Sequence, residues 1–238
     1  MIPLRDHHAR KTATPVVNVL LIAANALAFF YELSLGARLE GFVMSAAFVP
    51  ARLTEDGLTI GDLPLGLESG LISMFLHGGW MHFLGNMLFL WVFGDNIEER
   101  LGKLRYLAFY LLAGYAATWA HLMANPGSMV PAIGASGAIS GVLGAYLFLH
   151  PTAKIETLVI FVIFFRTFLV PAWVFLPIWF LMQILPGIAS LRTVGAEAGG
   201  VAWFAHIGGF VAGPILLFLL GGWRKRPPRR EERPGPWT

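Results

Sequence analysis

Cysteine is absent from this 238-residue chain, and charged residues are scarce. Without cysteine there is no disulfide framework and no thiolate chemistry, which leaves the redox compartment open. Asp, Glu, Lys and Arg make up 13% of the residues, about half of the roughly 25% that is typical of a soluble domain. The deficit comes from several long apolar runs, and the charges gather between these runs and at the two ends. This pattern indicates a protein that crosses a membrane several times.

Other missing patterns exclude further classes of function. The net charge is only +3 and no basic face alternates with aromatic residues, which argues against nucleic acid as a partner. There is no HExxH motif for a metalloprotease, and no pair of aspartates lies within the apolar runs. An internal repeat and acidic residues at mid-membrane are also missing, which disfavours a proton-coupled transporter.

Six segments are mostly apolar over about the 20 residues that a membrane span needs. We expect spans at about 15–33, 75–93, 104–123, 134–149, 170–187 and 203–222. The stretch 157–168 contains Arg166, which would be costly at the centre of a bilayer, so we place this stretch at a membrane interface. The predicted fold class is therefore an all-α membrane protein, with a six-transmembrane-helix bundle over residues 15–222.

Basic residues alternate between the loops, which predicts the orientation. They occur before the first span, in the 94–105 loop, in the 150–168 segment and in the tail "RKRPPRR", whereas the 34–74 loop has more acids than bases. The positive-inside rule then places both termini in the cytoplasm. We expect residues 1–14 to form a cytoplasmic segment, the first apolar run to be a retained span rather than a signal peptide, and 223–238 to be a basic, Pro-rich, disordered tail. The run "IEERLGK", Ile97 to Lys103, is interpreted as a charged cytoplasmic turn.

Polar residues from three spans fall at a similar depth, near the outer face. Ser136 lies in the first turn of the fourth span and His206 in the first turn of the sixth. His82 and Asn86 lie near the start of the second span, four residues apart and so on one helix face. Ionisable residues within spans are expensive, and we treat them as candidate functional residues.

Small residues recur at every fourth position of the fourth and sixth spans, a spacing that lets two helix backbones approach closely. The positions are Gly137, Gly141 and Ala145 in the fourth span and Ala205, Gly209 and Gly213 in the sixth. A close pairing of these spans would bring Ser136 and His206 within reach of each other.

That pairing would provide the parts of acyl-transfer chemistry. Serine is a weak nucleophile until an adjacent base, usually neutral histidine, takes its proton. The developing oxyanion needs hydrogen-bond donors, which Asn86, His82 and the Ser136 backbone N–H at a helix start could supply. No Asp or Glu lies within a span near these residues, so the sequence predicts a Ser-His dyad rather than a triad.

These motifs, in this order, resemble the rhomboid family of intramembrane serine proteases. The resemblance covers residues 15 to 222 and lies in "HGGWMHFLGN" (His77 to Asn86), "GASG" (Gly134 to Gly137) and "AHIGGFVAG" (Ala205 to Gly213). It implies Ser136 as nucleophile and His206 as general base, with His82 and Asn86 in the oxyanion hole and Gly209 and Gly213 packing the sixth span against the fourth. It also implies a partly submerged 34–74 loop and a fifth span that gates lateral access of substrate.

Two positions depart from the family pattern. Where many members carry a Trp-Arg pair in the first loop, this chain has Glu68 and Ser69. Where some members have a Tyr that stacks on the base histidine, this chain has Ser140. The first departure affects how the loop sits, and the second affects the orientation of His206.

Each candidate residue also has a structural interpretation. Ser136 could cap a helix, and His82 and Asn86 could join helices without a catalytic role. For His77 we favour a structural role, a hydrogen bond that ties the first loop to the second span. Gly134 counts with the other motif glycines as structural support. The rival class is a non-catalytic membrane protein, either a client-binding pseudoprotease or a small transporter.

We therefore expect an intramembrane serine endopeptidase that cuts transmembrane segments of membrane proteins near the outer face. It needs no metal, cofactor or nucleotide. Its partners are transmembrane protein substrates and the lipid bilayer, and the sequence leaves the oligomeric state open. Because the N-terminus lacks an Arg-rich, acid-poor transit segment, the expected location is a bacterial plasma membrane.

Overall fold

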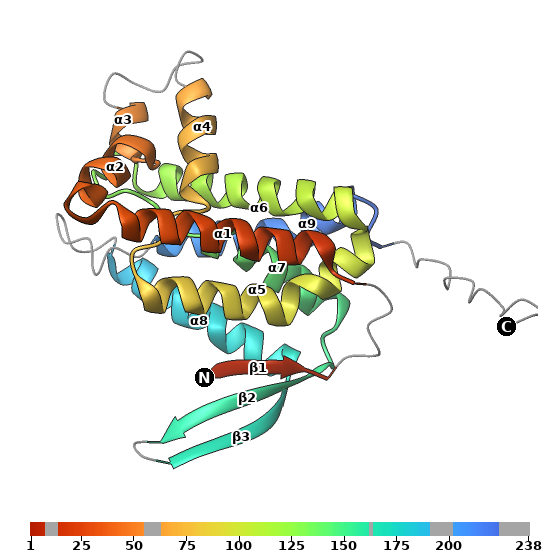
Figure 1. Ribbon diagram of the computed structural model, residues 1–238. Helices are drawn as coiled ribbons and strands as arrows, with labels where there is room; N and C mark the ends of the chain where they lie inside the picture. The colour runs from red at the N-terminus through yellow and green to blue at the C-terminus, as the bar shows by residue number, and fades with distance from the viewer. Residues whose placement is uncertain (8–13, 55–62, 162–163, 191–201, 224–238) are drawn as a thin grey trace, which may run out of the picture.

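Six long helices form the body of the protein (Figure 1). The computed structural model describes residues 1–7, 14–54, 63–161, 164–190 and 202–223. The helices follow the six predicted spans along the chain: α1 (Val16–Ser34), α5 (Trp80–Leu101), α6 (Lys103–Ala124), α7 (Ser136–Leu149), α8 (Ala172–Ser190) and α9 (Trp203–Leu219). In the described part of the chain, α1 and α6 are long and apolar enough to cross a membrane, while α7, α9 and the first part of α8 are shorter apolar helices. The six-span topology and its orientation stay predictions.

Helix α7 occupies the centre of the bundle. It packs against α5, α6, α8 and α9, and Figure 1 shows it enclosed by these neighbours. Every residue from Gly137 to Tyr146 is buried, as expected for a short helix that is apolar on all its faces. The first residue of this central helix is Ser136.

The charged segment predicted to be a turn, 97–103, is helical up to Leu101 and forms the end of α5. Ile97 and Leu101 are buried, the helix continues to Leu101, and Gly102 with φ of 81° separates it from α6. The buried Glu98 carboxylate accepts hydrogen bonds from the backbone N–H groups of Val17 at 3.1 Å and Asn18 at 2.7 Å. A carboxylate at a helix N-terminus satisfies orphan amides and the helix dipole together, so this end of α5 fixes the start of α1.

The expectation of an entirely helical chain is wrong, because three strands form an antiparallel sheet in the order β1-β2-β3. The strands are β1 (Ile2–Asp6), β2 (Lys154–Phe161) and β3 (Phe164–Pro171). Pairing of β2 with β3 runs from Lys154↔Pro171 to Phe161↔Phe164. The predicted interfacial segment 157–168 is thus a β-hairpin, although positions 162–163 lie outside the described residues. In Figure 1 the sheet lies beside the helices, next to α5 and α8.

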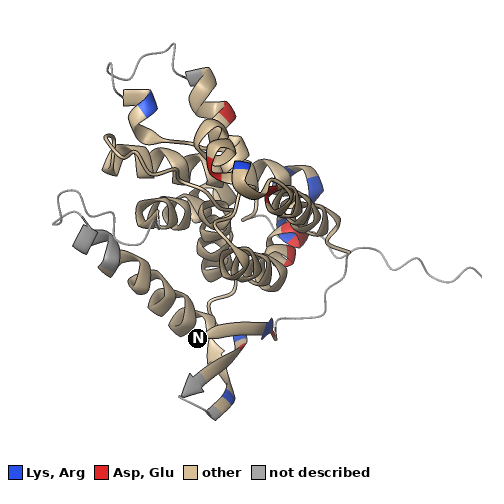
Figure 2. Cartoon of the chain, turned by 60° about the vertical axis from the view of Figure 1, so that its left-hand side comes forward, with Lys and Arg blue, Asp and Glu red and all other residues tan. Residues whose placement is uncertain are grey.

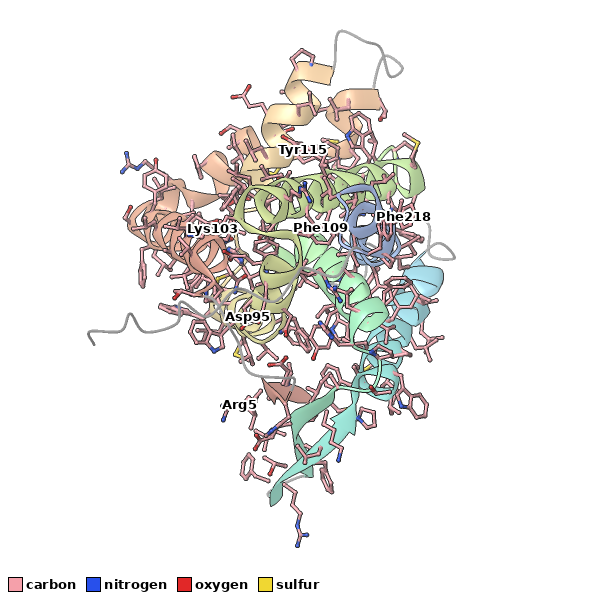
Figure 3. All side chains as sticks on the ribbon, turned by 90° about the vertical axis from the view of Figure 1, so that its right-hand side faces the viewer. Arg5, Asp95, Lys103, Phe109, Tyr115 and Phe218 are labelled. Carbon is pink, nitrogen blue, oxygen red and sulfur yellow. The ribbon has the colours of Figure 1, made fainter. Side chains whose placement is uncertain are left out.

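The predicted N-terminal segment 1–14 contains a strand, because residues 2–6 form β1. At its end the buried Asp6 accepts hydrogen bonds from Asn96 Nδ2 at 3.0 Å and Tyr146 Oη at 3.2 Å. These bonds attach the sheet to α5 and α7; Figure 3 labels Arg5 on the strand and Asp95 on the facing part of α5. Residues 8–13 and most of the predicted tail, 224–238, lie outside the described residues.

The 34–74 loop contains a 3-10 turn η1 (Gly36–Arg38) and the helices α2 (Leu39–Ala46), α3 (Pro50–Thr54) and α4 (Leu63–Ser73). Helix α4 packs on α6, where the Tyr115 hydroxyl donates to the Leu67 carbonyl at 2.9 Å; Tyr115 is labelled on that side of α6 in Figure 3. Side chains of Leu65, Leu67 and Leu71 are exposed. Figure 2 shows that Lys, Arg, Asp and Glu occupy only a few places on the ribbon. Submersion of this loop in a bilayer stays a prediction.

Candidate active site

Helices α7 and α9 cross with their backbones in direct contact. A Cβ atom placed at Gly209 would overlap the carbonyl oxygen of Gly137, and one placed at Gly213 would overlap the carbonyl oxygen of Gly141. Gly141 is also tight against α6, because a Cβ there would lie 2.6 Å from Ala113 Cβ. Only glycine leaves room for this approach, which brings the first turns of the two helices together.

The spacing of small residues on α7 is slightly different from the predicted one. Gly144, rather than Ala145, faces the backbone of α9, because a Cβ at Gly144 would overlap the carbonyl oxygen of Phe210. Ala145 is fully buried as well. The drift from 141 to 144 fits a helix with 3.6 residues per turn, in which every fourth residue gradually leaves the contact line.

Ser136 and His206 are in hydrogen-bond contact. The Oγ atom of Ser136, in the first turn of α7, lies 2.8 Å from Nε2 of His206, in the first turn of α9. Both side chains are half-buried. The contact joins residues 70 positions apart in the chain, and it follows from the close helix crossing just below them.

The second ring nitrogen of His206 meets a residue that the sequence did not point to. Nδ1 of His206 lies 2.8 Å from Oε1 of Gln183, on α8. A side-chain carbonyl oxygen only accepts hydrogen bonds, so Nδ1 is the protonated nitrogen of the neutral ring and Nε2 carries the lone pair. The Ser136 hydroxyl therefore donates to His206. Gln183 was not predicted because it lies alone in an apolar run, in a span whose depth and rotation the sequence does not define.

Aromatic residues flank His206 even though Ser140 replaces the stacking tyrosine of some family members. The Trp179 ring lies 6.2 Å from the His206 ring with an interplanar angle of 41°, and the Trp203 ring lies 6.2 Å away at 88°. The Ser140 hydroxyl instead donates to the Ser136 carbonyl at 2.6 Å. Trp179 of α8 and Trp203, the first residue of α9, thus contact the histidine ring, and no aromatic residue of α7 stacks on it among the described contacts.

His82 faces the space next to Gly134. The Gly78 backbone N–H donates to Nδ1 of His82 at 3.3 Å, so Nε2 carries the proton of the neutral ring. A Cβ atom placed at Gly134 would lie 2.6 Å from His82 Nε2 and 3.4 Å from Ser136 Oγ. Because Gly134 has no side chain, a space remains between the Nε2–H of His82 and the Oγ atom of Ser136.

Asn86, one turn after His82 on α5, carries an unused donor. It is 8% exposed, and its Nδ2 atom has no hydrogen-bond partner among the described residues. Burial of an unpaired amide costs about 1–3 kcal/mol, and such groups are uncommon in folded proteins. The Nδ2 group of Asn86 is therefore available to donate a hydrogen bond to a bound group.

The "GASG" segment is held from the first loop. The Gly134 backbone N–H donates to the Ser73 carbonyl at 2.8 Å, and the Ala132 N–H donates to the Phe48 carbonyl at 2.8 Å. The Ser73 hydroxyl in turn accepts a hydrogen bond from the Phe48 N–H at 2.7 Å. The Gly134 amide is thus already used, whereas the Ser136 amide lies at the start of α7, where N–H groups lack intrahelical acceptors.

His77 lies at the junction between α1 and α5. Its backbone N–H lies 3.1 Å from both carboxylate oxygens of Glu32, at the end of α1. Its ring is 3% exposed, contacts the Phe75 carbonyl through Nδ1 at 3.2 Å, and packs edge-on against Phe83. This differs from the predicted hydrogen bond to the second span: the His77 backbone bonds to Glu32 of α1, and the ring meets α5 through aromatic contacts with Phe83 and His82.

The other departure, Glu68 and Ser69, lies on α4, away from the serine. Glu68 is exposed, and the Ser69 hydroxyl donates to the Leu65 carbonyl within the same helix at 2.6 Å. In the part of the chain that the structure describes, no three His, Asp or Glu side chains gather in a way that could hold a metal ion.

Comparisons with known proteins show which family this chain resembles. Residues 69–223 match the family model described as the Rhomboid domain. The chain is 32% identical over 184 residues to "Rhomboid protein 1, mitochondrial" of Saccharomyces cerevisiae, a match that covers 69% of this chain and 45% of the yeast protein. It is 30% identical over 166 residues to "Presenilin-associated rhomboid-like protein A, mitochondrial" of Danio rerio, covering 66% and 39%. It is 36% identical over 155 residues to "Rhomboid-like protease 5" of Toxoplasma gondii, covering 61% and 15%. The chain spans less than half the length of each of these relatives.

Proposed function

The chain belongs to the rhomboid family, and we propose that it is an intramembrane serine endopeptidase that cuts transmembrane segments near the outer face of the membrane. The observation that carries this proposal is the 2.8 Å contact between Ser136 Oγ and His206 Nε2. The protonation of the opposite ring nitrogen makes Nε2 the acceptor in this contact. One of the relatives is itself named as a protease, which supports the same activity.

In the proposed first step, Ser136 attacks a peptide carbonyl carbon of the substrate. His206 Nε2 takes the hydroxyl proton as the Oγ–C bond forms, and the imidazolium then gives that proton to the leaving amine as the C–N bond breaks. The product is an acyl-enzyme on Ser136. In the second step water attacks the ester, loses its proton to His206, and releases the new carboxyl end while Ser136 regains its hydrogen.

The oxyanion of both tetrahedral intermediates would lie in the space beside Gly134. Its donors are the Nε2–H of His82, the unpaired Nδ2 of Asn86 and the Ser136 backbone N–H. Removal of one oxyanion donor from a serine hydrolase costs about 10²- to 10³-fold in kcat. We expect losses in this range for Asn86→Ala and His82→Ala.

We also propose the membrane setting of the enzyme. Six spans with both termini in the cytoplasm agree with the distribution of basic residues and would place Ser136 near the outer face. The substrates are transmembrane proteins that reach the site within the bilayer. The proposed location is a bacterial plasma membrane; two relatives are named as mitochondrial, so fractionation of the native host cell is the measurement that decides between the two membranes.

The proposed function is tested by cleavage of a model transmembrane substrate in proteoliposomes that contain purified protein. We expect cleavage by the wild type and its loss in Ser136→Ala and His206→Ala. Ser140→Ala is the matched control, since it removes a hydroxyl one turn further along α7 that is directed at a backbone carbonyl. It should keep its activity.

Labelling by a serine-directed fluorophosphonate separates the protease from the rival, non-catalytic class. The wild type and Ser140→Ala should be labelled, and Ser136→Ala should not. Failure of the wild type to cleave several substrates and to take the label would favour a client-binding pseudoprotease or a transporter. Equal cleavage by wild type and Ser136→Ala would point to a contaminant and refute the assignment of the nucleophile.

A further inference from the structure

We propose that Gln183 on α8 is a positioning residue for the base: its side-chain carbonyl accepts the Nδ1 proton of His206 and so directs the Nε2 lone pair at Ser136. This inference rests on the proposed function, and it makes the site a three-residue chain from α7 through α9 to α8. The neutral amide takes the place that a carboxylate occupies in a Ser-His-Asp triad.

The orientation of the Gln183 amide is defined by its second contact. Its Nε2 group donates to the backbone carbonyl of Trp179, one turn earlier on α8, at 3.3 Å. A carbonyl oxygen cannot accept from another carbonyl oxygen, so the NH₂ group must face Trp179 and Oε1 must face His206. The helix backbone therefore specifies which end of the amide the histidine meets.

This arrangement favours one histidine tautomer over the other. With the proton on Nε2, Nδ1 and Gln183 Oε1 would be two acceptors 2.8 Å apart, and the ring could not accept the serine proton. With the proton on Nδ1, both contacts of the ring are satisfied. Gln183 is 9% exposed, and the loss of its carbonyl would leave the Nδ1–H of the half-buried His206 without its protein acceptor.

The same contact stabilises the ring after proton transfer. When His206 takes the serine proton it becomes an imidazolium, and its hydrogen bond to Oε1 becomes charge-assisted and therefore stronger. A neutral amide contributes less than a carboxylate would, but it adds no buried charge that must be desolvated in the resting site. Gln183 thus acts through His206 and does not touch the substrate.

The kinetic test compares Gln183→Met, which keeps the length of the side chain but removes the acceptor, with Gln183→Glu, which keeps an oxygen at that place. General-base catalysis contributes typically 10²- to 10⁴-fold, so partial misorientation of the base should lower kcat of Gln183→Met by about 10- to 100-fold. KM should change by less than about twofold. Gln183→Glu should recover part of the loss, because the acceptor is restored. Met182→Leu, at the exposed neighbouring position, is the control and should match the wild type.

A pH profile adds a reading that a packing defect would not produce. The groups that face His206 are Ser136 from α7, Gln183 from α8, and the imidazoles of His82 and His121 from α5 and α6. A carboxylate at position 183 would favour the imidazolium, so the acid limb of the cleavage profile of Gln183→Glu should move to higher pH. The profile of Met182→Leu should stay in place.

A spectroscopic test does not depend on activity. Gln183 is the only glutamine of the chain, so selective ¹⁵N-glutamine labelling gives a single side-chain amide to follow. We expect its resonances to shift between wild type and His206→Ala, because the hydrogen bond to the ring is lost. Unchanged resonances, or a Gln183→Met enzyme with kcat within about twofold of wild type, would overturn the inference. A wild type that neither cleaves nor takes the fluorophosphonate would refute the proposed function, while the amide resonance would still report whether the contact exists.

Discussion

Substitution of Gly134 by alanine should remove activity without unfolding the protein. The backbone at Gly134 has φ of 123°, a conformation that an L-residue adopts only under strain of about 1–3 kcal/mol. The added Cβ atom would also lie 2.6 Å from Nε2 of His82, closer than van der Waals contact allows, so the ring must move. The methyl group would then occupy the space that we assign to the oxyanion.

The magnitude follows from these two effects. Displacement of the His82 donor should lower kcat by about 10²- to 10³-fold, which is about 2.7–4 kcal/mol of transition-state stabilisation. The backbone strain should lower the free energy of unfolding by about 1–3 kcal/mol, a loss that a domain with about 5–15 kcal/mol of stability tolerates. Activity and stability should thus fall by different amounts.

The assay measures kcat for cleavage in proteoliposomes together with the unfolding midpoint of the same preparation. Gly79→Ala is a strain-matched control, because Gly79 has φ of 140° and a Cβ there would have nothing within 4 Å. It should lose similar stability and keep most of its activity. Wild-type kcat in Gly134→Ala, or an equal loss of kcat in both variants, would refute the location of the oxyanion space.

Three further substitutions test the frame that holds the site. Gly209→Ala should lower the free energy of unfolding by about 1–3 kcal/mol or more and abolish cleavage, because its Cβ would overlap the Gly137 carbonyl. Thermal unfolding and the cleavage assay measure these two effects. Wild-type values in both would contradict the close crossing of α7 and α9. Glu98→Ala should lower the free energy of unfolding by about 1–3 kcal/mol, since it leaves two amides at the start of α1 without an acceptor, while kcat per folded molecule stays unchanged. Asp6→Ala should lower the free energy of unfolding by about 1–3 kcal/mol, because it leaves the Tyr146 hydroxyl on α7 without this acceptor and removes one of the acceptors of Asn96 Nδ2 on α5; an unfolding midpoint equal to that of wild type would mean that the Asp6 contacts do not stabilise the fold.

The long apolar segments and the glycine spacing were readable from the sequence because each is a periodic signal. Apolar runs of helical length predicted the positions of six helices, and glycines four residues apart predicted the close crossing that brings Ser136 and His206 into contact. Both depend only on the order of residues along one helix. The roles assigned to these residues stay proposals.

The hairpin and the Gln183 contact depend on more than local periodicity. Along β2, Lys154 and Glu156 alternate with the buried Ile155 and Thr157, a period-two signal that the following run of apolar residues obscured. Pairing of β1 with β2 joins segments about 150 positions apart, and no short-range pattern specifies it. Gln183 meets His206 only because α8 has one particular rotation and depth, which are set by tertiary packing.

The β-sheet holds the start of α8 in place. β3 runs directly into the helix, and the first α8 amides, of Ala172 and Trp173, donate to the Ala153 and Pro151 carbonyls at 2.8 and 2.9 Å. Gln183 lies about 16 Å along the helix from this anchor, at 1.5 Å per residue. A tilt of α8 by about 10° around the anchor would carry Gln183 about 3 Å, the length of a hydrogen bond. The hydrogen bond between Gln183 and His206 therefore depends on how the sheet holds the start of α8, as well as on the packing of α8 against α9.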